Sequence, residues 1–298
     1  MSAHRHRSAA SIAPHAGEAR VARRSSLLWS SAPGAARTID VLGLPMENVR
    51  LADAASDLIE AGREGRQIRV VFANAHVMNC AAADPAYRQT VASADWRYAD
   101  GSGLAIAARL AGNYLADNVN GTDLLPLLAA QAVRGNATMF LLGGAPGAAA
   151  GSASTLAARG FPQAIAGTHH GFFEKGSVDE DRVIAQINAS GASVLLVGMG
   201  VPLQDQWIER NAHRLQVPVL VGVGGLFDFF SGKVTRAPEM LRTLGLEWTW
   251  RLALEPRRMW RRYLLGNGVF LARAAIAGLK ARFSATQMQP TVGGTTRA

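Results

Sequence analysis

The sequence predicts an α/β protein: a Rossmann-like parallel sheet core flanked by helices, with a basic C-terminal helical appendage. Several short apolar runs each end in a Gly-rich turn that leads into a helical pattern. This pattern is typical of parallel strands that are buried on both faces. The chain has 298 residues, of which 49% are hydrophobic, enough for a sizeable core. Arginines that cluster between positions 251 and 262 predict the appendage.

The two ends of the chain differ in composition from the middle. Residues 1–36 are rich in Ala, Ser, Arg, Pro and His, and their arginines face a single acid, Glu18. We therefore predict a disordered basic tail that lies outside the fold. Residues 286–298 are predicted to be a second disordered tail. The α/β core then spans residues 37–244, and the appendage spans residues 245–285.

The first expected elements lead up to Asn74. Residues 38–45 have the pattern of a short strand that glycine and proline terminate, and residues 46–64 have that of a helix with one apolar face. The apolar run 68–73 predicts a buried strand that ends at Asn74. A helix is expected directly after it.

Three further apolar runs predict buried strands, at residues 138–142, 193–197 and 217–223. Segment 94–99 is polar and a poor candidate for a buried strand, so the Gly-Ser-Gly turn after it matches a dinucleotide-binding fingerprint only weakly. Ligands of parallel sheets bind outside the carboxyl ends of the strands. We therefore expect four loops to converge there: Asn74, 143–147, 198–204 and 224–228.

Asp100 is the candidate catalytic residue. It lies at a turn that opens a helical apolar pattern, and the glycines at 101 and 103 let backbone N–H groups approach a ligand closely. A carboxylate at this position can also be the N-cap of the helix. A carboxylate close to a bound ligand can act as a general base.

The basic appendage is the candidate anion site. The net charge of +9 indicates an anionic partner: a nucleic acid, an acidic membrane or a phosphate-bearing substrate. Arg258, Arg261 and Arg262 have the spacing of one helical face, with Trp260 among them. This mixture suits the headgroup layer of an anionic membrane, and guanidinium groups also bind pyrophosphate well. The cluster is compact and no DNA-binding module accompanies it, so we expect no nucleic acid.

Metal-binding patterns are weak. Asp179-Glu180-Asp181 has an Asp-x-Asp spelling, but Ser177 precedes it at the spacing of a capping box, which predicts the start of a helix. His169-His170 has no further ligand nearby in the sequence. We therefore expect no metal and no other cofactor, and arginine remains as the means of holding a diphosphate. The sequence has no apolar run long enough to span a membrane, no secretory signal pattern and a single cysteine, which together favour the cytoplasm.

From about residue 70 to 270, an ordered series of motifs resembles the WecG/TagA/CpsF glycosyltransferases of family 26. The motifs are Asn74, 99–103, 121–124, 142–147, 171–173, 197–205, 224–228, 231–238, 246–248 and 255–258. The resemblance implies transfer of a sugar from a UDP-sugar to a polyprenyl-diphosphate-linked saccharide, with inversion at the anomeric carbon and without a metal. The sugar would be of the N-acetylmannosamine type or glucose, and the product a cell-surface polysaccharide or exopolysaccharide.

The same resemblance implies roles for individual residues. Asp100 becomes the general base, Asn74 and Gln204 line the pocket, and appendage arginines close over the donor diphosphate. Three positions depart from the family pattern: Phe72 replaces Thr, Leu203 replaces Lys and Asp205 replaces Glu. Because the change at Phe72 touches the pocket, the resemblance does not fix the identity of the sugar.

The predicted substrate-binding residues lie at strand ends, at helix entrances or in the appendage. They are Asn74, Gly101, Asp123, Gly144, Gln204, Asp205, Arg236, Arg251, Arg258 and Arg261. Structural roles stay open for four of them. Asn74 and Gln204 can satisfy loop backbone, Asp123 can cap the helix that follows it, and Arg236 can be a solvated loop charge.

The predicted partners are the UDP-sugar donor, the lipid-linked acceptor and an anionic membrane surface. We expect the protein to associate peripherally with the inner, cytoplasmic face of the cell membrane, and a homo-oligomer is left open. The alternative is a non-catalytic protein that binds a nucleotide-sugar or a nucleic acid.

Overall fold

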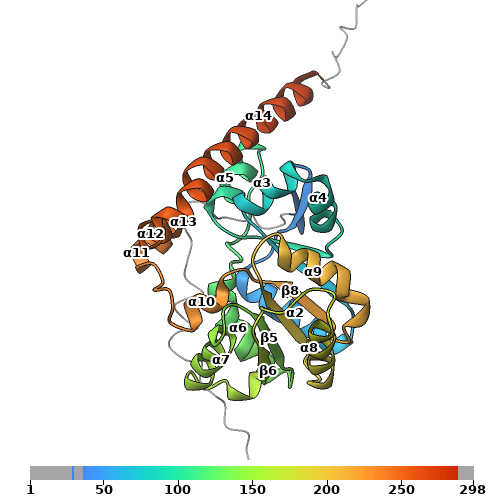
Figure 1. Ribbon diagram of the computed structural model, residues 1–298. Coiled ribbons are helices and arrows are strands. Elements are labelled where there is room, and N and C mark those ends of the chain that lie inside the picture. The colour runs from blue at the N-terminus through green and yellow to red at the C-terminus, as the bar shows by residue number, and fades with distance from the viewer. Residues whose placement is uncertain (1–28, 30–35, 288–298) are drawn as a thin grey trace, which may run out of the picture.

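The computed structural model describes residue 29 and residues 36–287, and it is built around one sheet (Figure 1). The strands are β1 (Thr38–Val41), β2 (Leu44–Glu47), β3 (Ile68–Ala73), β4 (Trp96–Ala99), β5 (Met139–Gly143), β6 (Ile165–His169), β7 (Val194–Gly198) and β8 (Val219–Gly222). Their order across the sheet is β1-β2-β4-β3-β8-β7-β5-β6. β1 and β2 pair antiparallel, and every other neighbouring pair is parallel. The predicted fold class is confirmed.

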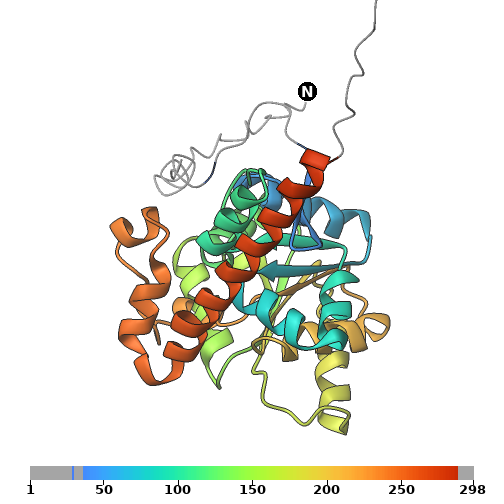
Figure 2. The same cartoon turned by 90° about the horizontal axis from the view of Figure 1, so that it is seen from above.

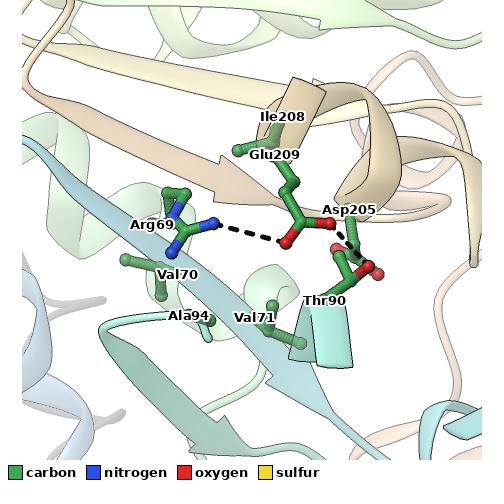
Figure 3. Close-up of a pocket in the computed structure, with 8 residues that line it drawn as sticks. All are labelled: Arg69, Val70, Val71, Thr90, Ala94, Asp205, Ile208 and Glu209. Atoms are coloured by element: carbon green, nitrogen blue, oxygen red, sulfur yellow. Dashed lines mark hydrogen bonds and ion pairs between the residues drawn. The ribbon is translucent and has the colours of Figure 1, made fainter. Parts of the chain in front are cut away.

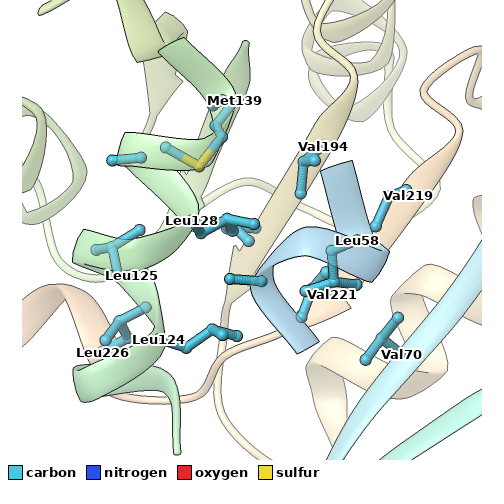
Figure 4. Packing of buried hydrophobic residues seen from close by; sticks show 14 of the residues in the cluster. Leu58, Val70, Leu124, Leu125, Leu128, Met139, Val194, Val219, Val221 and Leu226 are labelled. Atoms are coloured by element: carbon cyan, nitrogen blue, oxygen red, sulfur yellow. The ribbon is translucent and has the colours of Figure 1, made fainter. Parts of the chain in front are cut away.

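Helices cover both faces of the sheet. Those of the core are α2 (Leu51–Glu64), α3 (Ala75–Ala83), α4 (Pro85–Ala92), α5 (Ser102–Leu110), α6 (Gly121–Arg134), α7 (Ala148–Ala158), α8 (Val178–Ala189), α9 (Leu203–Asn211) and α10 (Leu226–Phe230), with 3-10 turns η1 (Pro162–Ala164) and η2 (Ala212–Arg214). On one face, Leu58 of α2 and Leu128 of α6 pack over valines of β3, β7 and β8 (Figure 4). This burial of apolar side chains stabilises the sheet.

Most apolar runs form strands where the sequence predicts them. β3 coincides with the run 68–73, and β5, β7 and β8 lie within the other three runs or extend past them by one residue. The expected helix start at Ser177 is also confirmed, because the Ser177 hydroxyl accepts hydrogen bonds from the backbone N–H groups of Asp179 and Glu180. The Asp-x-Asp spelling at 179–181 therefore belongs to the first turn of α8.

Three predictions about strands are wrong. The segment predicted as one strand at residues 38–45 is instead part of a β-hairpin, in which β1 and β2 pair across a turn at Leu42 and Gly43. These two residues have positive φ values of 56° and 78°, as two-residue hairpin turns require. Segment 94–99 contains β4, which the sequence argued against. Arg97 within it is buried, and its guanidinium donates to the carbonyl oxygens of Pro45, Val91, Ala92 and Ala94. β6 has no counterpart among the predicted strands.

The appendage is helical, as predicted, and is packed against the core. It consists of α11 (Glu239–Thr243), α12 (Glu247–Leu254), α13 (Pro256–Trp260), the π-helical turn η3 (Arg261–Leu265) and α14 (Gly266–Gln287). Pro256 occupies the first turn of α13, as expected. The long helix α14 crosses α3 and α5 (Figure 2), and Phe270 is fully buried in this contact.

The predicted tail boundaries need two changes. Trp29 is buried in the same apolar cluster as Phe270, so position 29 belongs to the fold although we placed residues 1–36 outside it. At the other end, α14 continues to Gln287, beyond the predicted limit at 285. Residues 1–28, 30–35 and 288–298 lie outside the described residues. Within the described part of the chain, no helix is both long and apolar enough to cross a bilayer.

Candidate active site

Asp100 and Asn74 lie side by side at the carboxyl ends of β4 and β3. The last residues of these strands, Ala99 and Ala73, are register partners in the parallel ladder. The Asn74 amide nitrogen donates to Oδ2 of Asp100 at 3.3 Å, and its Oδ1 accepts from the backbone N–H groups of His76 and Val77 at 3.1 Å. Asn74 therefore caps α3 and also orients the Asp100 carboxylate.

Asp100 is not the helix cap that the sequence left open. The N-cap of α5 is Gly101, with φ +92° and without any side-chain cap hydrogen bond. The Gly101 N–H donates instead to Oδ1 of Asn118 at 2.8 Å. The carboxylate of Asp100 is consequently held by Asn74 rather than by the helix that follows.

The pKa of Asp100 is raised from its ordinary value of 3.8 to about 6. Burial of the carboxyl is the largest cause, and the hydrogen bond from Asn74 opposes it. Among nearby charges, Glu247 raises the pKa and Arg262 lowers it. A carboxylate with this pKa is ionised at neutral pH yet is a stronger base than an exposed aspartate, which suits a general base.

The predicted residues Asp123 and Arg236 form an ion pair. Arg236 Nη2 is 2.7 Å from Oδ1 of Asp123, and Arg236 Nε is 3.6 Å from Oε1 of Glu247 in α12. The N-cap of α6 is Asn120, whose amide also donates to Asp123 Oδ2 at 2.9 Å. Both structural alternatives are therefore wrong: Asp123 is not the cap, and Arg236 is not a solvated charge. Together they connect α6 to the appendage.

Gln204 and Asp205 are buried beneath the carboxyl end of β8. Gln204 Oε1 accepts from the Gly224 N–H at 2.7 Å, so this residue satisfies loop backbone, the alternative left open for it. Asp205 Oδ2 accepts from the Tyr87 hydroxyl at 2.6 Å. Burial raises the pKa of Asp205 to about 6, and the Tyr87 hydrogen bond opposes that rise. Gln204 thus holds the β8–α10 turn, whereas Asp205 joins α9 to α4.

Replacing Tyr87 with phenylalanine should lower the free energy of unfolding by about 1–3 kcal/mol, because a buried carboxylate loses its hydrogen bond. The loss should be larger at pH 8 than at pH 5, since Asp205 is charged only above about 6. Urea unfolding at the two pH values measures this. The control is Tyr114→Phe, whose ring is 54% exposed. Equal unfolding midpoints for the two variants would contradict the role of Tyr87.

The backbone N–H of Gly144 is also engaged. It donates to the carbonyl oxygen of Gly198 at 2.8 Å, and the φ of Gly144 is +68°. A Cβ on Gly144 would lie 2.8 Å from that of Ala148, so the turn after β5 requires glycine. Gly144 and Gly101 thus shape their turns, and their N–H groups are occupied within the protein.

The three predicted appendage arginines differ in position. The guanidinium carbon of Arg251 lies 4.6 Å from the centre of the Phe229 ring. Its Nη2 atom is close to Gly225 at the carboxyl end of β8, since a Cβ added to that glycine would lie 3.4 Å from it. Its Nε is buried and has no hydrogen-bond partner among the described residues. Arg258 is exposed and pairs with Glu255 at 3.1 Å, and Arg261 is exposed beside Trp260. Of the three, Arg251 is the one the structure brings to the sheet edge.

Arg262 was grouped with the arginines of the candidate anion site but is absent from the predicted substrate-binding residues. Its charge lowers the pKa of both Asp100 and His76, and its side chain is half-buried, whereas Arg258 and Arg261 are exposed. Helical spacing placed Arg258, Arg261 and Arg262 on one face. The π-helical turn η3 changes the register between them, and no sequence pattern marks that change.

A small cavity lies between β3, α4 and α9 (Figure 3). Its charged side chains satisfy one another: Arg69 Nη1 is 3.8 Å from Glu209, and the Thr90 hydroxyl donates to Glu209 at 2.7 Å. Of the predicted site residues, Asp205 alone lines it. Elsewhere in the described residues, no group of three or more His, Cys, Asp and Glu side chains is arranged to hold a metal ion.

The protein is thus an α/β protein whose parallel sheet has a carboxylate of raised pKa at its carboxyl edge, with an arginine-bearing helical segment packed against the core. The chain belongs to the glycosyl transferase WecG/TagA/CpsF family, whose sequence profile matches residues 39–284. It is therefore a glycosyltransferase, and the resemblance seen in the motifs is confirmed.

The chain is also similar to two Staphylococcus aureus proteins, from strains NCTC 8325 / PS 47 and COL. Both are named N-acetylglucosaminyldiphosphoundecaprenol N-acetyl-beta-D-mannosaminyltransferase. Each is 27% identical over 244 residues, which cover 81% of this chain and 94% of the relative. The family profile, which matches residues 39–284, spans the core and the appendage together.

Proposed function

We propose that the protein transfers a sugar from a UDP-sugar to a polyprenyl-diphosphate-linked saccharide, with inversion at the anomeric carbon. The observation that carries this proposal is the Asp100–Asn74 pair, a carboxylate of raised pKa at the carboxyl ends of adjacent strands. Family membership and the names of the relatives support the lipid-linked acceptor. The transferred sugar is of the N-acetylmannosamine type or glucose.

In the proposed reaction Asp100 takes the proton of the acceptor hydroxyl. The acceptor oxygen forms a bond to the anomeric carbon on the face opposite UDP, and the bond from that carbon to the UDP oxygen breaks. UDP leaves with the electron pair, so the configuration inverts. Asn74 holds one carboxylate oxygen by its 3.3 Å hydrogen bond, which leaves the other oxygen for the proton.

Arg251 is our candidate for stabilising the departing diphosphate without a metal. Its guanidinium lies at the end of β8, where ligands of parallel sheets bind. Arginine can hold a diphosphate through paired charge-assisted hydrogen bonds. The unpartnered Nε of Arg251 is a donor that such a ligand would satisfy. Arg236 is paired with Asp123 and Glu247, and it would thereby hold α12, the helix that carries Arg251, in place.

The appendage also supports peripheral binding at the inner face of the cell membrane. Its exposed apolar side chains are Leu254, Trp260, Leu264, Leu265, Val269, Ile276 and Leu279. The exposed arginines Arg257, Arg258 and Arg261 lie in the same segment. Apolar and basic side chains side by side are typical of surfaces that bind anionic lipids.

Release of UDP from a panel of UDP-sugars tests the proposal. We expect the wild-type protein to release UDP with one of these donors only when a lipid-diphosphate-linked saccharide is present, and to retain that activity in EDTA. Loss of activity in EDTA would reject the metal-free mechanism. Binding of UDP-sugar or nucleic acid without turnover on any donor would favour the non-catalytic alternative.

A further inference from the structure

Arg262 differs from Arg236, Arg251 and Arg258 in having no carboxylate partner among the described residues. Arg251 and Arg258 both approach Glu255, and Arg236 pairs with Asp123. Among the ion pairs of the described residues, none includes Arg262. Its side chain is half-buried, and its guanidinium lies 5.6 Å from the ring of Tyr263. A half-buried arginine without a counter-ion is suited to an anionic ligand.

Hydrogen bonds from α3 fix the position of this arginine. The Asn79 amide donates to the carbonyl oxygen of Gly266 at 2.7 Å, and Arg273 donates to the carbonyl oxygen of Met78 at 3.2 Å. The π-helical turn that carries Arg262 ends at Leu265, immediately before this contact. The turn that carries Arg262 is thereby held against α3, and the charge of Arg262 lowers the pKa values of His76 and Asp100.

The same turn exposes apolar side chains. Leu264 and Leu265 are 54% and 56% exposed, and Val269 is 55% exposed. Within a few residues the chain thus combines a half-buried cation with an exposed apolar strip. A ligand that fits both has an anionic group joined to a long apolar chain.

We propose that Arg262 binds the diphosphate of the lipid-linked acceptor, with the first isoprene units along Leu264, Leu265 and Val269. The inference rests on the proposed function, because a reaction between two diphosphate-bearing substrates needs two separate anion sites. Arg251 lies at the end of β8, whereas Arg262 lies in the turn before Gly266, which is hydrogen-bonded to α3, the helix that follows β3. The acceptor sugar then extends from Arg262 to Asp100, and the donor diphosphate lies at Arg251.

Direct binding tests this assignment without turnover. The full-length protein is titrated with farnesyl diphosphate, inorganic pyrophosphate and farnesol. Arg262→Ala should weaken farnesyl diphosphate binding by about 10- to 100-fold, the range for a lost charged hydrogen bond. Leu264→Ser should weaken farnesyl diphosphate but not pyrophosphate. The control Arg257→Ala removes an equal charge from an exposed position of the same segment.

Equal farnesyl diphosphate affinities for Arg262→Ala and Arg257→Ala would overturn the assignment and indicate general surface attraction. In the transfer assay, Arg262→Ala should raise the KM for the acceptor while the KM for the donor stays near that of the wild type. A rise confined to the donor KM would also overturn it. Failure of the proposed function would show separately, as absence of UDP release by the wild-type protein with every donor.

Discussion

Substituting Asp100 with asparagine should lower turnover by about 100-fold or more, the usual range for a lost general base, while UDP still binds. Asparagine keeps the shape of the side chain and removes only its ability to accept a proton. The wild-type kcat/KM should rise with pH through about 6, the pKa of the Asp100 carboxyl, because the ionised form is the base. Initial rates of UDP release from pH 5 to 8 measure both effects.

The same variant should be more stable than the wild type at neutral pH. The folded-state pKa of Asp100 is about 6, above its ordinary value of 3.8, so the folded protein holds this proton more tightly than the unfolded chain. Ionising Asp100 therefore lowers the free energy of unfolding as pH rises from about 4 to about 6. Asparagine carries no charge and escapes that loss. A catalytic carboxylate is expected to reduce stability in this way.

Asp53→Asn is the matched control, since Asp53 is exposed on α2. It should leave turnover, pH profile and unfolding midpoint near their wild-type values. If Asp100→Asn retained more than a tenth of the wild-type turnover, Asp100 would not be the base. If it kept the rise near pH 6, another group would be responsible for that titration.

The sequence predicted the part of the site that depends on strand ends. A buried apolar run has few alternatives to a strand, and in a parallel sheet the residues after adjacent strands must meet. Asn74 therefore lies at the sheet edge as expected. Asp100 beside it was assigned to the site by the family resemblance and not by a strand end, because β4 was not predicted. β4 escaped prediction because Arg97 is a charged residue whose burial depends on four carbonyl groups from other segments.

The rest of the site depends on contacts that no local pattern encodes. Gln204 and Asp205 follow a strand end, as ligand residues often do, and in the fold they also accept hydrogen bonds from Gly224 and Tyr87, which lie in distant segments. The placement of Arg262 depends on the π-helical turn that carries it, and the sequence did not predict that turn. In both cases the type of residue was predictable, whereas the direction of its side chain depended on packing between distant segments.

Phe270→Ala should have the largest effect on stability among the appendage variants, lowering the free energy of unfolding by about 3–5 kcal/mol. The ring is fully buried among apolar side chains of α3 and α5, and it would lie 3.4 Å from a Cβ on Gly103, next to the Asp100 turn. Its loss removes the main apolar contact that holds α14 on the core. Urea unfolding measures the change.

This variant should also lose activity, because η3 and α14 carry Arg262 and cover the region of Asp100. With α14 displaced, water reaches the carboxylate and the pKa of Asp100 should fall toward 3.8, since burial is the largest cause of its rise. Any residual activity should then have its acidic limb shifted to lower pH.

Ile276→Ala on the same helix is the control, because that side chain is 55% exposed and its loss should change the unfolding free energy by less than about 0.5 kcal/mol in the absence of lipid. If Phe270→Ala were as stable and as active as Ile276→Ala, α14 would be a passive attachment. The predicted combination of lost stability, lost turnover and a shifted acidic limb follows only if the docked helix both completes the fold and sets the pKa of the base.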